Sequence, residues 1–116
     1  IGNVPLFTVT GEVVILLLVP FCTTTLVGAT ATLALGVTGA TSLFIPATTA
    51  TLILANTFWV DTGPDANGIA IPAALKDIAI TDNIVGTVAT AAITAGVIRL
   101  DGYWIALSSD ANVVAA

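Results

Sequence analysis

The chain has 116 residues, a length that suits one domain, and 57% of them are hydrophobic, which is enough to bury a core. Only 8% are charged, against roughly 25% in an average soluble domain. Two basic residues and a net charge of −5 exclude a surface that neutralises nucleic-acid phosphates or binds an anionic membrane.

The charge-free stretch from Val13 to Val60 is the most unusual feature of the chain. A small domain has a large surface relative to its volume. A surface of Ala, Val, Thr and Gly exposes apolar patches, and such patches usually mark interfaces. We therefore expect other protein copies to cover much of this surface.

The apolar run VVILLLVPFC, residues 13 to 22, stops at Pro20 and is followed by three threonines. A membrane helix needs about 20 consecutive apolar residues, and a secretory signal needs a basic start. The run meets neither condition, so no membrane partner is expected. Because the chain starts at Ile1 and has no methionine, we expect a processed or truncated N-terminus.

The first half of the chain predicts strands, because Val, Ile, Thr and aromatic residues dominate between Gly and Pro. The long apolar strand that starts at Glu12 is expected to bury both faces, one in a core and one against a neighbour, and to end at Pro20 or lie at an edge. The expected strands are Leu6–Thr10, Glu12–Phe21, 29–37, Thr41–Ile45 and Thr57–Val60, with a short helix or irregular link over 47–56.

The second half follows the same pattern. A polar loop covers 61–68, a turn with Gly96 at positive φ covers 91–96, and a short tail, Asn112 to Ala116, closes the chain. Gly102 is a candidate bulge. The expected strands are Gly68–Ile71, Leu75–Thr81, Ile84–Thr90 and Val97–Leu107. Residues 1–116 are therefore expected to form one all-β domain, an antiparallel β-sandwich or jelly-roll-like barrel of about eight short strands.

Catalysis is not expected. The chain has no histidine, and its single cysteine, Cys22, is predicted to be a small buried hydrophobe. No phosphate loop or zinc spacing is present. Asp61, Asp65 and Asn67 have oxygen ligands at near-calcium spacing, but so few ligands favour a polar turn. No cofactor, metal or small-molecule substrate is predicted.

Interface candidates come from the two longest expected strands. Arg99 and Asp101 lie two residues apart and so share a face of their strand with Tyr103. Sparse charges in an apolar interface can fix its register, and an aromatic residue can anchor it. Trp59 and Trp104 are expected in the core. The candidate interface residues are Val14, Leu16, Leu18, Arg99, Asp101 and Tyr103.

The phrases LFTVTGEVVILLL, VGATATLALGVTGATSLFIPATTAT, FWVDTGPDA and DNIVGTVATAAITAGVIRLDGYWIALSSDANVVAA span nearly the whole chain. These segments resemble the sequences of small β-rich virion structural proteins of tailed bacteriophages. The resemblance implies a particle component, such as a capsid decoration or cement protein that forms homo-oligomers and contacts the major capsid protein. It supplies no active-site residues.

Two other functions remain open. A secreted filament or surface-layer subunit would donate an N-terminal strand, such as Leu6 to Leu18, to the next subunit. A carbohydrate-binding module would expose Trp59 or Tyr103 on a flat face.

Overall fold

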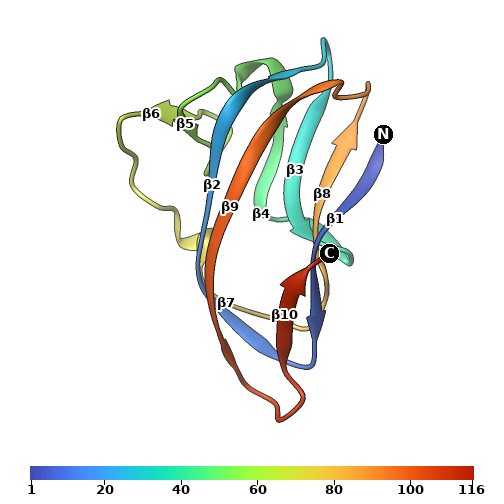
Figure 1. Ribbon diagram of the computed structural model, residues 1–116, viewed down its shortest axis with the longest axis vertical. Coiled ribbons are helices and arrows are strands. Elements are labelled where there is room, and N and C mark those ends of the chain that lie inside the picture. The colour runs from blue at the N-terminus through green and yellow to red at the C-terminus, as the bar shows by residue number, and fades with distance from the viewer.

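A computed structural model describes residues 1–116 as ten β-strands and two 3-10 helices (Figure 1). The all-β fold expected from the sequence is confirmed, with two antiparallel sheets and ten strands instead of about eight. The elements are β1 Gly2–Thr10, β2 Val13–Val27, β3 Thr32–Val37, β4 Ala40–Thr49, η1 Ala50–Leu52, β5 Thr57–Phe58, β6 Asp65–Ala66, η2 Ala73–Leu75, β7 Lys76–Ile80, β8 Ile84–Ala89, β9 Ala95–Ala106 and β10 Asn112–Ala115.

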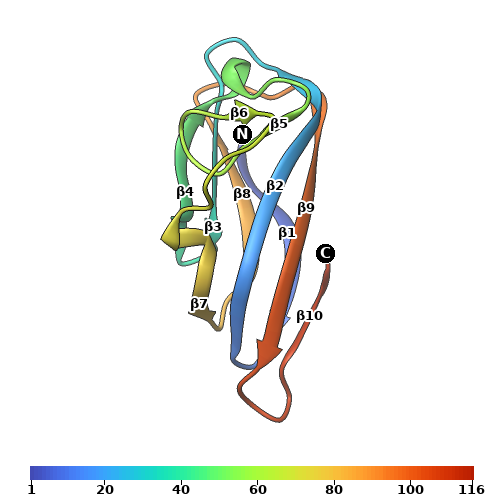
Figure 2. The same cartoon turned by 90° about the vertical axis from the view of Figure 1, so that its left-hand side faces the viewer.

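The two sheets pack face to face as layers, which Figure 1 shows edge-on and Figure 2 shows from the side of sheet B. Sheet A has the strand order β10-β1-β8-β3-β4. Sheet B is built around β2, which pairs with β9 along one side. On its other side, β2 pairs with β7 between Val13 and Leu17 and with β5 at Phe21 and Cys22, and β5 pairs in turn with β6. The longest strands, β2 and β9, therefore lie side by side and form one margin of the sandwich.

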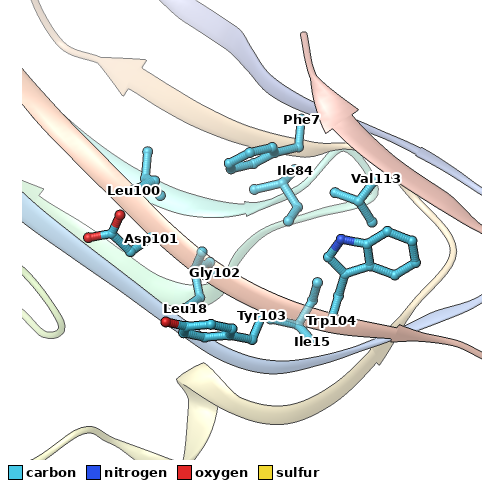
Figure 3. Close-up of a pocket in the computed structure, with 10 residues that line it drawn as sticks. All are labelled: Phe7, Ile15, Leu18, Ile84, Leu100, Asp101, Gly102, Tyr103, Trp104 and Val113. Carbon is cyan, nitrogen blue, oxygen red and sulfur yellow. The ribbon is translucent and has the colours of Figure 1, made fainter.

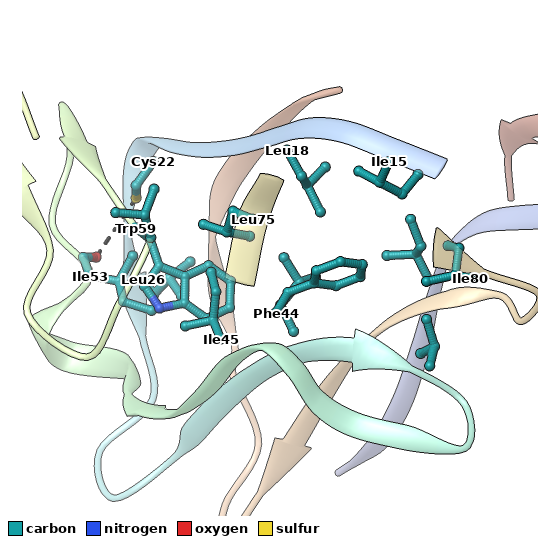
Figure 4. Packing of buried hydrophobic residues seen from close by; sticks show 14 of the residues in the cluster. Ile15, Leu18, Cys22, Leu26, Phe44, Ile45, Ile53, Trp59, Leu75 and Ile80 are labelled. Carbon is teal, nitrogen blue, oxygen red and sulfur yellow. Dashed lines mark hydrogen bonds between the residues drawn. The ribbon is translucent and has the colours of Figure 1, made fainter. Parts of the chain in front are cut away.

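The core lies between the sheets, and β2 contributes Val13, Ile15, Leu18, Cys22 and Leu26 to it (Figure 4). Trp59, the largest buried side chain, is 2% exposed, as the sequence predicts. Its indole Nε1–H donates a hydrogen bond of 3.0 Å to Thr48 Oγ1, and this hydroxyl donates to the carbonyl of Pro46. Every buried side-chain nitrogen or oxygen has a hydrogen-bond partner, so no polar side chain weakens the core.

Pro20 was expected to end its strand or mark an edge, and this prediction is wrong. β2 continues to Val27 and is the central strand of sheet B. The carbonyl of Pro20 accepts a hydrogen bond from the Trp59 N–H at 3.0 Å, away from β9. A strand residue points its N and O to the same side. The missing N–H therefore faces the place where the partner of β2 changes from β7 to β5, and no ladder bond is lost there.

The strand expected to stop at Ile45, just before Pro46, also runs further, since β4 continues through Pro46 to Thr49. β4 is the edge strand of sheet A, and its pairing with β3 shifts register between Leu33 and Leu35, opposite Pro46. Edges and bulges are the places where a sheet tolerates proline. The link that follows is partly as expected: after the strand ends, Ala50–Leu52 form one 3-10 turn.

The remaining strands were predicted with mixed success. β1, β7, β8 and β9 are confirmed within a few residues, and Gly96 has the expected positive φ, +119°. Gly68–Ile71 is not a strand, because this segment leads through Pro72 into η2. The C-terminal tail was not expected to be a strand, yet Asn112–Ala115 pairs with β1. The structure contains no helix with the length and hydropathy that a membrane crossing requires.

Candidate interaction surface

The outer face of sheet B, the face turned away from the core, carries most of the interface residues predicted from the sequence. Alternation along β2 and β9 defines this face, because directly opposed residues of antiparallel strands lie on the same side. Its pairs across the two strands are Val14 with Ile105, Leu17 with Tyr103, Val19 with Asp101 and Phe21 with Arg99. Exposed Val97 continues the row on β9.

A bulge in β2 decides which leucines belong to this face. Ile15 pairs with Trp104 and Leu17 pairs with Tyr103, so Leu16 is an extra residue on β2. Leu16 is 37% exposed, whereas Leu18 is 1% exposed and lies in the core. The expectation that Leu18 belongs to the interface is therefore wrong. Strict alternation would place Leu16 and Leu18 on one face, and the bulge puts them on opposite faces.

The sequence placed the bulge at Gly102, and this too is wrong. Gly102 pairs regularly with Leu18, and the irregularity lies in the partner strand. β9 itself runs without a register break from Val97 to Ala106, because all the extra residues belong to β2.

One ion pair lies on the outer face. The Nε of Arg99 is 2.9 Å from Oδ2 of Asp101, and both side chains are more than half exposed. The guanidinium of Arg99 also lies 5.3 Å from the ring centroid of Phe21, within reach of a cation–π contact. Phe21 in turn packs edge-on against Phe58, with 4.9 Å between centroids. Solvent screening leaves little stabilisation in such an exposed pair, so its chief effect on the monomer is to orient the Arg99 side chain.

Tyr103 is 65% exposed and pairs with Leu17 of β2, which on its other side pairs with Lys76 of β7. The carbohydrate alternative needs an exposed Trp59 or Tyr103, and only Tyr103 meets that condition. Ile105, 49% exposed, belongs to the same face but was not among the predicted residues. Ile105 follows Tyr103 by two residues on the same strand and therefore shares a face with Arg99, Asp101 and Tyr103, which is the signal that could have identified it.

Two apolar hollows of about 290 and 310 Å³ lie along the seam between β9 and sheet A. Figure 3 shows the residues that line the first of them. Leu100 of β9 lines both of them. In Figure 3, Trp104 lies close to Val113 of β10 at one end of the seam. Trp104 was predicted to be a core residue, yet it is 36% exposed because the sandwich is open on this side.

The loop between β5 and η2 behaves as a polar turn. The carboxylate Oδ1 of Asp61 accepts a hydrogen bond of 2.8 Å from the Gly63 N–H, and Asn67 has a φ of +69°. Asp and Asn commonly make such local bonds and adopt such angles. No group of three His, Cys, Asp or Glu side chains gathers anywhere in the structure.

Cys22 is fully buried on the core side of β2, as predicted. Its Sγ donates to the carbonyl of Thr24 at 3.1 Å. Desolvation by burial raises the pKa of the thiol, and backbone hydrogen bonds at Thr24 and Leu26 partly oppose this rise. A buried thiol with a raised pKa is a poor nucleophile.

The structure thus brings five of the six predicted interface residues to one face, namely Val14, Leu16, Arg99, Asp101 and Tyr103. Comparison of the chain with models of protein families, with curated proteins and with solved structures finds no match in any of the three. The case for a function therefore depends on the geometry and chemistry of this face.

Proposed function

We propose that the protein is a structural subunit that assembles with copies of itself through the outer face of sheet B. One observation carries the proposal. On this face β2 presents Val14, Leu17, Val19 and Phe21, and β9 adds Val97, Tyr103 and Ile105 beside the single ion pair of Arg99 and Asp101. Apolar surface removed from water contributes about 25 cal/mol per Å², so covering the face with a second protein surface is favourable.

Within that class, we propose a component of a bacteriophage particle, most specifically a capsid decoration or cement protein that contacts the major capsid protein. The resemblance in sequence supports this assignment, and so does the apolar outer face of sheet B. Such a subunit would act by bracing its neighbours through burial of sheet surface. A secreted filament or surface-layer subunit is the alternative.

The alternative of strand donation through Leu6 to Leu18 receives less support from the fold. Leu6–Thr10 lies inside sheet A, where β1 pairs with β8 and β10, and Val13–Leu18 lies at the centre of sheet B. Donation of this segment would dismantle both sheets of the donor. Deleting residues 1 to 18 should therefore unfold the chain, as far-UV circular dichroism would show; a folded deletion variant would revive the alternative.

A matched pair of substitutions tests assembly through the outer face. Ile105 on β9 and Val114 on β10 are equally exposed, at 49% and 48%, but Val114 belongs to sheet A. Ile105→Glu should shift the protein toward monomer in light scattering, because a carboxylate resists burial. Val114→Glu should leave assembly unchanged, and equal behaviour of the two variants would count against this face.

The particle assignment has its own test. Mass spectrometry of density-purified phage particles that carry this coding sequence should detect the chain at a fixed ratio to the major capsid protein. Its absence from the particles would refute the virion role and leave assembly itself in place.

A further inference from the structure

The free edge of β9 is the longest uninterrupted sheet edge in the molecule. β9 hydrogen-bonds to β2 on one side, and no strand pairs with its other side. The edge of β4 is interrupted by Pro46 and register shifts, and the other edge strands, β7, β10 and β6, have five, four and two residues. Unpaired N–H and C=O groups along an edge are a template for another strand. Figure 2 shows β9 at the margin of sheet B.

The charges on β9 select the strand that fits this edge. Charged side chains of one sign deter an edge from pairing with its own copy, because like charges meet. Arg99 and Asp101 have opposite signs and are two residues apart on the same face. An antiparallel copy of β9, related by a two-fold axis through Leu100, puts Arg99 opposite Asp101 of the second copy and Asp101 opposite its Arg99.

Neighbouring registers lack this complementarity. A two-fold axis at Arg99 places the two arginines directly opposite each other, and an axis at Asp101 does the same with the two aspartates. Like charges directly opposed across a sheet are destabilising. The sequence of β9 is therefore self-complementary about Leu100.

The other pairs of this register also fit. Val97 lies opposite Tyr103 of the second copy, a pairing of β-branched and aromatic residues that stabilises sheets. Ile98 lies opposite Gly102, which has no side chain to crowd it. The two Leu100 side chains meet on the inner side, beside the hollows that Leu100 lines in each copy. A second strand would thus cover apolar surface that the open seam leaves exposed.

We propose that two copies of the chain pair through β9, antiparallel and centred on Leu100, so that sheet B continues from one subunit into the other. This inference rests on the proposed function, since it names the first contact in self-assembly. The two outer faces then join into one apolar surface of twice the width, on which further subunits or a particle surface can pack.

Engineered cysteines test the register. Val97 and Tyr103 are exposed, so Val97→Cys and Tyr103→Cys should fold normally. Directly opposed residues have Cα atoms about 4.5–5.5 Å apart, which suits a disulfide. A mixture of the two variants should form a cross-linked dimer under mild oxidation. Each variant alone should not, because its two cysteines would be offset by six residues, roughly 20 Å. The unmodified chain, with buried Cys22, is the control.

Charge exchange tests the specificity of pairing. Arg99→Asp and Asp101→Arg each turn two attractive contacts into repulsive ones, so each should weaken dimerisation on the order of tenfold or more. The double variant, R99D with D101R, restores opposite charges in the same register and should recover the wild-type dimerisation constant in sedimentation equilibrium. A double variant as weak as the single ones would overturn the proposal.

The outcomes separate this inference from the proposed function. If the chain associates but only the single-cysteine variants cross-link, or the charge variants associate normally, pairing through β9 is refuted and assembly through the outer face stands. If the chain stays monomeric at every concentration, both proposals fail.

Discussion

At the scale of single residues, Trp59 shows how the core combines volume with hydrogen bonding. Its indole is buried between the sheets and donates to Thr48, which is itself 1% exposed. Trp104 offers the contrast, since it lies at the open seam and is 36% exposed. The two tryptophans should therefore differ in how much stability their replacement removes.

Trp59→Phe should lower the free energy of unfolding by about 1–3 kcal/mol, because it leaves a cavity and removes the bond to Thr48. Trp104→Phe should cost less than about 1 kcal/mol. Urea unfolding followed by far-UV circular dichroism measures both without depending on tryptophan emission. Equal losses would show that the seam is closed in solution.

Cys22 links stability to pH. Because burial raises the pKa of its thiol, the unfolded chain releases the thiol proton at a lower pH than the folded chain does. Below about pH 8.5, the ordinary pKa of a thiol, the free energy of unfolding does not change through this group. Above that pH, the free energy of unfolding falls by up to about 1.4 kcal/mol per pH unit until the thiol of the folded chain also ionises.

Cys22→Ala removes this dependence, so the difference in unfolding free energy between wild type and variant should shrink as the pH rises from 8 to 10. Urea unfolding at a series of pH values measures that difference. A constant difference would mean that the buried thiol does not titrate differently in the two states.

At the scale of elements, the bulge in β2 sets which side chains reach the outer face. Leu18→Ala should cost about 2–5 kcal/mol, because it empties a buried site, whereas Leu16→Ala should cost less than about 1 kcal/mol. Thermal unfolding compares the two directly. Similar losses of stability would mean that both leucines lie on the same side of β2, which would contradict the bulge at Leu16.

The sequence predicts the elements better than their pairing. Alternation of apolar residues along Val97–Leu107 identifies β9 and its exposed face correctly, because local side-chain direction depends only on the strand. The interruptions at Pro20 and Pro46 could not be interpreted from local pattern. Whether a proline ends a strand depends on which neighbour faces its missing N–H, and that neighbour is distant in sequence.

The residues of the outer face differ in the same way in how well the sequence predicts them. The alternation within one strand places Arg99, Asp101 and Tyr103 on one face, whereas the burial of Leu18 depends on a bulge that forms when β2 pairs with β9. The seam and its hollows were not predicted, because they result from the spacing of two sheets. The strand Asn112–Ala115 was missed because its few residues carry little pattern, and its pairing with β1 stabilises it.

At the scale of the whole molecule, the distribution of charge follows from the fold. The stretch from Val13 to Val60 carries no charge at pH 7 and supplies β2, β3, β4 and β5, which surround the core. The same β2 is one of the two strands that define the outer face of sheet B, where its apolar side chains have no core to enter. An isolated chain would leave this surface in water, and pairing with other copies would cover it.

Sedimentation velocity of the unmodified chain, from micromolar to millimolar concentration, shows whether copies of the chain cover this surface. The average mass should rise with concentration from one chain to two and beyond. A single species with the mass of one chain at every concentration would contradict self-assembly.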